Sequence, residues 1–371
     1  MTELKNVIRD TKQYIRLPLL NEHWYVAGLT EEFGRDLIAR TLLEKSIVFY
    51  RTEAGELIAL QNRCLHRSYP LAESKLSGDN IICGYHGIEY SPMGEINSVP
   101  CQTQCPKGKL RKYPVKELGP FVFIWMGDPE KLDNGKADES KLPEMPYLEN
   151  PNFLSVYEAK HIEGNYLLMQ DNLNDLTHFL FIHANTIAAA ENSIDHTYLD
   201  RPVEFEERNG ITGCYRVIED TELVQSDLSP EQRLEVGERK LKNWNGGVSQ
   251  APGVWLGENF VHVEDSAPEY ADCYKTYINH FVTPEKHDTC HYWYSVTNEY
   301  LGPNPEFSEF LKAGLGVAFG EDVTAVQHMQ RVLEDDNTQY DEININGDKS
   351  AILFRRKTLE WALDEYPELE L

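Results

Sequence analysis

The sequence has little of what marks secreted, membrane or nucleic-acid-binding proteins. Its first residues, 1–6, are polar, and no apolar stretch follows a basic start, so no secretory signal is visible. No run approaches the ~18 apolar residues of a membrane span. Lysine and arginine number 35 against 61 acidic residues, and the net charge of −26 would repel nucleic-acid phosphates. We therefore expect a cytoplasmic protein that binds neither a membrane nor nucleic acid.

Cysteine is also scarce. Seven cysteines, an odd number in a chain of 371 residues, argue against a disulfide scaffold and suit free thiols with a few metal ligands. No flavin or nicotinamide fingerprint is found, so a redox enzyme with this sequence would need a separate reductase. Hydrophobic residues make up 41% of the chain, which is enough for the cores of two domains.

The order of residue patterns suggests two domains. Short β-branched or aromatic runs, separated by Gly, Asp, Asn and Pro, begin at Trp24, Ser46, Leu57, Ile81 and Phe121. A polar stretch over 131–146 then predicts a linker. Farther on, 164–183 is expected to be helical, strands are expected at 203–205, 276–282 and 291–296, and helices at the C-terminal end, the last over about 349–363. We divide the chain into 1–130, a linker over 131–150, and 151–371.

Two short motifs each offer one cysteine and one histidine. Cys64-Leu-His66 is followed, after sixteen residues, by Cys83-Gly-Tyr-His86. A Rieske cluster binds one iron through two thiolates and the other through two imidazoles, so two such loops would complete it. A zinc finger instead pairs Cys with Cys and His with His, and a chance pattern of buried residues is the remaining alternative. The alternating order favours a [2Fe-2S] Rieske cluster.

A second pair of histidines lies in the segment 171–183, DNLNDLTHFLFIH. An iron that activates oxygen is suited by two histidines and one carboxylate on one face, with positions left open for O₂. His178 and His183 can supply the imidazoles. Five residues turn a regular helix by about 140° net, so we expect a distorted or terminating turn between them. The alternative is a helix end at which two histidines flank an apolar run.

Both motifs resemble one enzyme family. The strings RCLHRSYPL, IICGYHGIEYSPMGE and SVPCQ, within 61–102, resemble the Rieske domain of aromatic-ring oxygenases. Respiratory Rieske proteins carry a disulfide where this chain has Tyr69 and Tyr85, so that type is excluded. DNLNDLTHFLFIH is similar to the NLxDLxHxxxxH signature of vanillate O-demethylase, toluene-sulfonate methyl-monooxygenase and dicamba demethylase oxygenases. The resemblance implies an α+β fold class: an N-terminal all-β Rieske [2Fe-2S] domain followed by an α+β helix-grip (START-like) catalytic domain with a mononuclear non-haem Fe(II).

In the resembled family the third iron ligand belongs to an acidic pair that opens a late helix, here Glu321 and Asp322. Helical phase favours Asp322, because residues 4, 7 and 11 positions later are apolar, whereas the stripe of Glu321 includes His328. The alternative is that both acids merely suit the positive end of a helix dipole.

The resemblance also implies roles for residues around the iron. Asp175 would accept a hydrogen bond from His178 and reach the Rieske His86 of a neighbouring subunit, which requires a homotrimer. Asn172 would lie near the iron as a polar neighbour. His280 is the polar candidate for substrate binding, although a histidine satisfied at a strand edge is an alternative. Further pocket candidates are Ile187, Trp255 and Phe319.

These features predict the oxygenase component of a multicomponent Rieske monooxygenase. It would use O₂ and NAD(P)H-derived electrons to hydroxylate, or to O- or N-demethylate, a substituted aromatic compound. The alternatives are a ring-hydroxylating, cis-dihydroxylating dioxygenase and an electron-transfer protein without catalysis. A separate reductase or ferredoxin would supply electrons. Four cations, at Lys107, Lys109, Arg111 and Lys112, could form its docking patch or simply a solvated loop.

Overall fold

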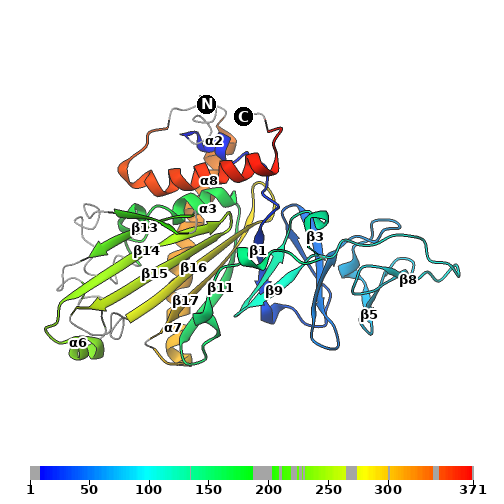
Figure 1. Cartoon of the computed structure of the whole chain (residues 1–371), viewed down its shortest axis with the longest axis horizontal. Helices are drawn as coiled ribbons and strands as arrows, with labels where there is room; N and C mark the ends of the chain where they lie inside the picture. Colours follow the sequence, from blue (N-terminus) through cyan, green and yellow to red (C-terminus); the bar gives the residue numbers. More distant parts are fainter. Residues whose placement is uncertain are drawn as a thin grey trace. The chain divides into compact units, whose positions relative to one another are not determined.

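The structure is a computed structural model, shown in Figure 1, which describes residues 9–133, 135–186, 203–208, 211–218, 224, 228, 230–264, 274–299, 301–336 and 342–369. The chain forms two compact units. The first, called the β unit, is Asn21–Glu144 with Thr283–Lys286. The second, called the mixed unit, is Met1–Leu20, Met145–Val282 and His287–Leu371. Compared with the expected division, the N-terminal residues belong to the mixed unit and the polar stretch as far as Glu144 belongs to the β unit.

Polar contacts explain why the N-terminal residues join the mixed unit. The short helix α2 (Thr11–Tyr14) buries Tyr14 completely, and the Tyr14 hydroxyl lies 3.3 Å from Oγ1 of Thr358. Thr11 donates to Glu342 at 2.9 Å and accepts from Arg355 at 2.7 Å. These partners are more than 300 residues away in sequence, so no local pattern could have revealed them.

The β unit consists of three small antiparallel sheets. β1 (Trp24–Leu29) pairs with β10 (Phe121–Trp125), which pairs with β9 (Val115–Leu118). The second sheet is β2 (Ile38–Leu42), β3 (Lys45–Arg51) and β4 (Leu57–Gln61). The third is β5 (Lys75–Ser77), β6 (Asn80–Ile82), β7 (Glu89–Tyr90) and β8 (Ile96–Ser98). Short 3-10 turns lie at Thr30–Glu32, Leu71–Glu73, Pro129–Lys131 and Glu139–Lys141. This unit is all-β, as the sequence predicted.

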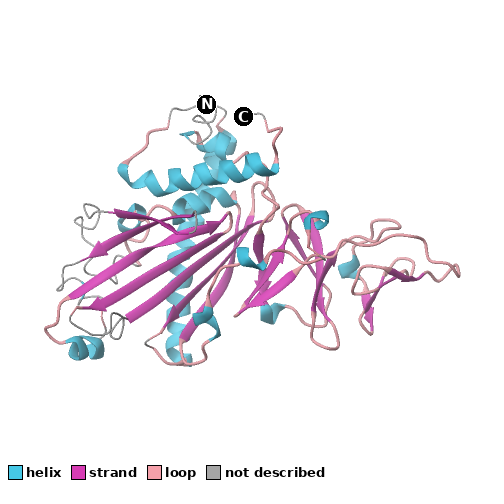
Figure 2. Cartoon of the chain, in the orientation of Figure 1, coloured by secondary structure: helices cyan, strands magenta, loops and turns pink. Residues whose placement is uncertain are grey.

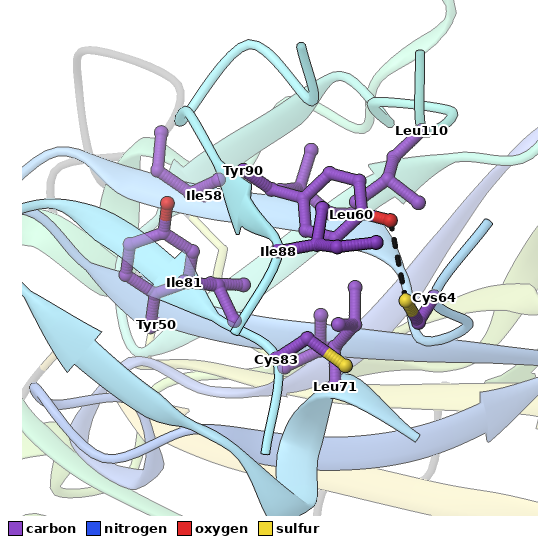
Figure 3. Packing of buried hydrophobic residues seen from close by; sticks show 11 residues of the cluster. Tyr50, Ile58, Leu60, Cys64, Leu71, Ile81, Cys83, Ile88, Tyr90 and Leu110 are labelled. Carbon is purple, nitrogen blue, oxygen red and sulfur yellow. Dashed lines mark hydrogen bonds between the residues drawn. The ribbon is translucent and has the colours of Figure 1, made fainter. Parts of the chain in front are cut away.

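A shared hydrophobic core joins the second and third sheets of the β unit. Tyr50 and Ile58 face each other across β3 and β4, and Ile81 faces Tyr90 across β6 and β7. All four side chains are fully buried in one cluster, which also contains Cys64 and Cys83 at its border (Figure 3). Burying side chains of this size stabilises the folded state by about 1.5–3 kcal/mol each. The two cysteines are therefore held by a packed core.

The mixed unit is built on one seven-stranded sheet. Its strands are β11 (Leu154–Ile162), β12 (Val203–Arg208), β13 (Ile211–Ile218), β14 (Leu241–Ala251), β15 (Val254–Val263), β16 (Tyr274–Pro284) and β17 (Cys290–Asn298). The order is β11-β17-β16-β15-β14-β13-β12, so the first strand lies beside the last, as Figure 1 shows. The expected strands at 203–205, 276–282 and 291–296 are present as β12, β16 and β17.

Helices pack against this sheet in the mixed unit (Figure 2). Helix α7 (Pro305–Asp335) packs along β11, α3 (Tyr166–Leu173) contacts both α7 and α8 (Lys349–Glu365), and α8 also contacts β13. The short α6 is Pro230–Val236, and 3-10 turns lie at Pro146–Glu149 and Asn346–Asp348. No helix within the described ranges is long and apolar enough to cross a membrane.

Helix α7 corrects one expectation. It begins behind an Asn304 cap with Pro305 at its first position and runs for 31 residues, about 46 Å. Glu321 and Asp322 therefore lie in the middle of the helix and do not open it. A dipole effect is confined to the first and last turns, so it cannot account for this acidic pair.

Candidate metal centres

The two cysteine–histidine motifs form loops with the same hydrogen-bond pattern. In each loop the cysteine N–H donates to the carbonyl five residues later, at 2.9 Å for Cys64 and 2.8 Å for Cys83. The N–H four residues after the cysteine donates back to the cysteine carbonyl, at 3.0 Å from Ser68 and 2.9 Å from Gly87. Both of these residues have positive φ, 59° and 73°. The positive φ suits glycine and strains serine, which indicates that the loop geometry is imposed at both positions.

The four candidate ligands divide by exposure. Cys64 and Cys83 are 3% and 2% exposed, whereas His66 and His86 are exposed and their Nδ1 atoms lie 3.2 Å apart. Neither imidazole makes another hydrogen bond to the described part of the chain. Two buried sulfurs and two outward imidazole nitrogens are the donor set that a Rieske [2Fe-2S] cluster requires. The residues fit that cofactor.

Tyr90 adds a contact to the sulfur side of this site. Its buried hydroxyl accepts from the Leu65 N–H at 3.0 Å and lies 3.3 Å from Sγ of Cys64, the contact drawn as a dashed line in Figure 3. Burial raises the pKa of Cys64, but Tyr90 and backbone N–H groups lower it more, so the net pKa is lowered. For Cys83 burial prevails and the pKa is raised. A hydroxyl that donates to sulfur favours negative charge there.

The segment that carries His178 and His183 is only partly helical. Helix α3 ends at Leu173, where Asn174 returns its side-chain amide to the Gln170 carbonyl at 2.8 Å. A 3-10 turn, Thr177–Leu180, then carries His178, and His183 follows in a further turn. The prediction of a helix over all of 164–183 is wrong, because the hydrogen bond from the Asn174 side chain accompanies the end of α3 at Leu173. The expected break between the two histidines is present, since the 3-10 turn stops at Leu180.

The two histidines and Asp322 form a second group of possible metal ligands, separate from the cysteine–histidine loops. Their ligand atoms all lie within 4.8 Å of one another. Oδ1 of Asp322 is 3.2 Å from Nε2 of His183 and 3.5 Å from Nε2 of His178. Asp322 and His183 are buried, at 3% and 1% exposure. Two imidazoles and one carboxylate are the donor set of a mononuclear non-haem iron with open positions.

The hydrogen bonds of His183 show that the cluster is suited to a cation. Nδ1 of His183 lies 2.9 Å from Oε2 of Glu321, and a carboxylate only accepts, so Nδ1 carries the proton. The Nε2 atom then faces the Asp322 oxygen at 3.2 Å, an arrangement that either a proton or a metal ion between the two atoms would stabilise. Burial lowers the pKa of His183, but Asp322 and Glu321 outweigh it and raise the pKa. The residues present therefore fit an iron ion.

His178 lies in a different environment. Burial lowers its pKa, although Asp322 and Asp175 act in the opposite direction. Its Nδ1 is buried and has no well-formed hydrogen bond in the described structure. Oδ1 of Asp175 instead accepts from the N–H and hydroxyl of Thr177 at 2.7 and 2.6 Å. The expected bond from His178 to the Asp175 carboxylate is therefore not formed, and the two residues do not share a helical face because α3 has already ended.

Asn172 lies where the sequence placed it, beside the cluster. Its amide nitrogen donates to Oδ1 of Asp322 at 3.2 Å, so this oxygen is held from α3 while its backbone belongs to α7. The Oδ1 atom of Asn172 is buried and unpartnered among the described groups. Asn172 therefore restrains the carboxylate that lies nearest both histidines.

His280 lies near Asp322 on β16, a strand between β15 and β17 and not at an edge. It is 4% exposed, and its Nδ1 lies 2.7 Å from the hydroxyl of Tyr292. Trp255 and Phe319 surround the ring at centroid distances of 5.2 and 5.0 Å. Burial lowers the pKa of His280 to about 3, with an opposing effect of Asp322, so the ring is neutral at pH 7. The candidate Ile187 lies outside the described residues.

The basic loop differs from a free docking patch. Arg111 donates to the carbonyls of Met126 and Gly127 at 2.8 and 2.6 Å and lies over the ring of Tyr113. Lys109 pairs with Glu95 at 3.4 Å, and Lys112 pairs with Glu56 at 3.5 Å. Only Lys107 has no such contact in the described structure. Three of the four cations thus form hydrogen bonds or ion pairs within the β unit, and the bonds of Arg111 help to stabilise the fold of that unit.

The sequence did not predict the roles of four residues at these sites: Tyr90, Glu321, Thr186 and Tyr292. Each acts through a partner that is distant in sequence, from 12 to 138 residues away. Tyrosines are common in strands, so Tyr90 and Tyr292 carried no signal. The role of Glu321 could have been inferred from helix geometry. If Asp322 points into the site, the preceding residue of the helix is rotated by about 100° and can reach the side of the same site.

Comparison with known proteins identifies both units. Residues 23–114 match the Rieske [2Fe-2S] domain family, and residues 162–364 match the Vanillate O-demethylase oxygenase C-terminal domain family. The iron–sulfur subunit of a toluene-4-sulfonate monooxygenase system of Comamonas testosteroni is 28% identical over 84% of this chain and 88% of its own length. The oxygenase component of dicamba O-demethylase of Stenotrophomonas maltophilia is 26% identical over 83% and 87%.

Solved structures agree with the fold. Dicamba monooxygenase bound to 3,6-dichlorosalicylic acid superposes with a TM-score of 0.79 at 24% identity, covering 94% of this chain and 99% of that one. The predicted order, an all-β Rieske domain followed by a mixed α+β domain, is confirmed.

Proposed function

The chain belongs to the family of vanillate O-demethylase oxygenases, and we propose that it inserts oxygen into a methyl, methoxy or N-alkyl substituent of an aromatic compound. It is the oxygenase component of a multicomponent Rieske monooxygenase and takes its electrons from a separate protein. Relatives that match over most of this chain are named for toluene-4-sulfonate, vanillate, dicamba and a chloroacetanilide. These four are substituted aromatic compounds, and this is the substrate class that we propose.

One observation carries the proposal. His178, His183 and Asp322 come together within 4.8 Å in a chain that also has the complete Cys64, His66, Cys83 and His86 set. An electron-transfer protein needs the second set alone. We therefore assign His178, His183 and Asp322 as iron ligands and the four loop residues as cluster ligands.

The two cofactors would divide the chemistry: the cluster passes single electrons, and the mononuclear iron activates O₂ beside the substrate. The residues of the chain prepare the site. Asn172 holds the Asp322 carboxylate in place, and the burial of Asp322 and His183 leaves water little access, so that charge interactions in the site are strong.

Asp175 is our candidate for the link between metal centres of neighbouring subunits. Oδ1 of Asp175 is bonded to Thr177, and Oδ2 has no partner among the described residues. The unpartnered Nδ1 of His178 and the exposed ring of His86 are the groups it would connect. A homotrimer would bring Asp175 of one subunit to His86 of the next.

His280 is our candidate for orienting the substrate. The buried hydroxyl of Tyr292 has no other hydrogen-bond partner among the described residues, and we assign it as the donor to Nδ1 of His280. That leaves the proton on Nε2, and a neutral N–H can donate to an oxygen on the substrate. The aromatic rings of Trp255 and Phe319 would pack against the substrate ring beside it.

The proposal is tested by supplying a reductase, NADH and a panel of methoxy-, N-methyl- and methyl-aromatics while O₂ uptake is followed. We expect uptake that depends on one class of substrate, with release of formaldehyde from a methoxy or N-methyl group or formation of a benzylic alcohol from a methyl group. A cis-diol product would instead identify a ring-hydroxylating dioxygenase. If the cluster were reduced and reoxidised without any substrate-dependent O₂ uptake, the protein would be an electron carrier and not an oxygenase.

A further inference from the structure

Glu321 contacts His183, one of the proposed iron ligands, on the side of the imidazole ring opposite Asp322. Its Oε2 accepts from Nδ1 of His183 at 2.9 Å and from the hydroxyl of Thr186 at 2.6 Å. The other ring nitrogen of His183, Nε2, is the one that faces Asp322. Glu321 thus lies behind the imidazole, with its side chain 27% exposed, whereas Asp322 lies in front of it at 5%.

We propose that Glu321 is a positioning residue that fixes the orientation and tautomer of His183, and that Thr186 in turn holds Glu321. The inference rests on the proposed iron site. With its proton held on Nδ1, His183 can present only the Nε2 lone pair to a metal. A carboxylate behind the ring also increases the electron density on Nε2 and so its strength as a ligand.

Two consecutive residues of α7 therefore serve the same imidazole from opposite sides. A helix rotates by about 100° per residue, so Asp322 can point into the site while Glu321 passes along its flank. Each carboxylate also accepts a hydrogen bond from another side chain: Asp322 from the amide of Asn172, and Glu321 from the hydroxyl of Thr186.

The second imidazole lacks this support. No described side chain forms a hydrogen bond with Nδ1 of His178, and the carboxylate of Asp175 is bonded to Thr177 instead. The two histidines are therefore inequivalent: a carboxylate accepts a hydrogen bond from Nδ1 of His183, and no described carboxylate does so for His178. We infer that Glu321 sets the strength with which the site holds Fe(II).

The test compares Glu321→Gln, Glu321→Ala and Thr186→Val with Glu309→Ala, an exposed glutamate on the same helix. Fe(II) affinity is measured by chelator competition, and the EPR spectrum of the Fe(II)–nitric oxide adduct reports on the ligand field. We expect Glu321→Ala to weaken Fe(II) binding by about 10- to 100-fold with an altered adduct spectrum. Glu321→Gln keeps an acceptor for Nδ1–H and should lose less, and Thr186→Val less again. The EPR signal of the reduced cluster should not change in any of them.

Native Fe(II) affinity and an unaltered adduct spectrum in Glu321→Ala would overturn the inference. So would Glu321→Gln losing iron as completely as Asp322→Asn, because Glu321 would then be a ligand itself. If Glu321→Ala did not fold, the nearly isosteric Glu321→Gln would still distinguish these results. A native protein that bound no Fe(II) at His178, His183 and Asp322 would instead refute the proposed function.

Discussion

The two candidate metal centres of this chain are built in opposite ways. The proposed cluster ligands come from two loops within 23 consecutive residues, 64–86, and the two loops share one hydrogen-bond pattern. The proposed iron ligands come from a broken helix and from the middle of α7, and Asp322 is 139 residues after His183. The first centre is local in sequence, and the second exists only after the mixed unit has folded.

Exposure follows the same contrast. His66 and His86 lie at the surface, whereas His183 and Asp322 are buried. Imidazoles that pass electrons between proteins must approach a partner closely, so exposure suits them. A site that activates oxygen must exclude water, so burial suits it. The difference in exposure therefore matches the division between electron entry and catalysis.

The largest effect should come from removing one centre at a time. We expect Cys83→Ala to abolish the visible and EPR signals of the cluster while Fe(II) still binds in the mixed unit. We expect Asp322→Ala to do the reverse. Both variants should lose substrate-dependent O₂ uptake, because uptake needs the electrons delivered by the cluster as well as the mononuclear iron that activates O₂. If either substitution removed both metals, the two centres would not be independent.

Asp175→Asn should affect the connection between the centres. Both cofactors should remain bound, but oxidation of the reduced cluster in the presence of substrate and O₂ should slow by about 10- to 100-fold, because the substitution removes a charge that acts on His178. Rapid mixing with detection of the cluster absorbance measures this rate. Thr177→Val keeps the Asp175 charge and is the matched control. An unchanged rate in Asp175→Asn would remove Asp175 from the path.

Tyr90→Phe should alter the cluster alone. Loss of a hydrogen bond to sulfur disfavours the more negative, reduced form, so the reduction potential should fall. The free energy of unfolding should drop by about 1 kcal/mol. Tyr50→Phe is the control, since Tyr50 belongs to the same core but donates to the Asp79 carbonyl. An equal shift of potential in both variants would contradict a specific role for Tyr90.

The smallest effect concerns the pH dependence of stability in the mixed unit. The folded-state pKa of His280 is about 3, against an ordinary 6.5, so below pH 6.5 the unfolded chain binds a proton that the folded chain does not. Stability should therefore fall as the pH drops, and His280 should account for about 2 kcal/mol between pH 7 and pH 5. Urea unfolding at both pH values should show a shallower loss for His280→Asn. An identical loss would mean that His280 is protonated in the folded protein.

The same contrast explains what the sequence could predict. Cys64, His66, Cys83 and His86 were recognisable because their spacing alone completes a donor set. His178 and His183 required the resemblance to a family signature, and Asp322 was chosen by helical phase although the helix begins at Pro305, 16 residues before Glu321. Glu321 and Tyr90 could not be assigned, because their roles depend on which distant residues pack beside them. Arg111 was misjudged as a free cation, because the carbonyls that it binds become its neighbours only in the folded β unit.

The central claim, that one chain holds both a Rieske cluster and a separate catalytic iron, is tested most directly by the ratio of iron to acid-labile sulfide in the native protein and in His178→Ala. We predict that iron exceeds sulfide in the native protein, and that this excess is lost in His178→Ala while the cluster EPR signal persists. Equal amounts of iron and sulfide in both proteins would contradict the account and leave a Rieske electron carrier.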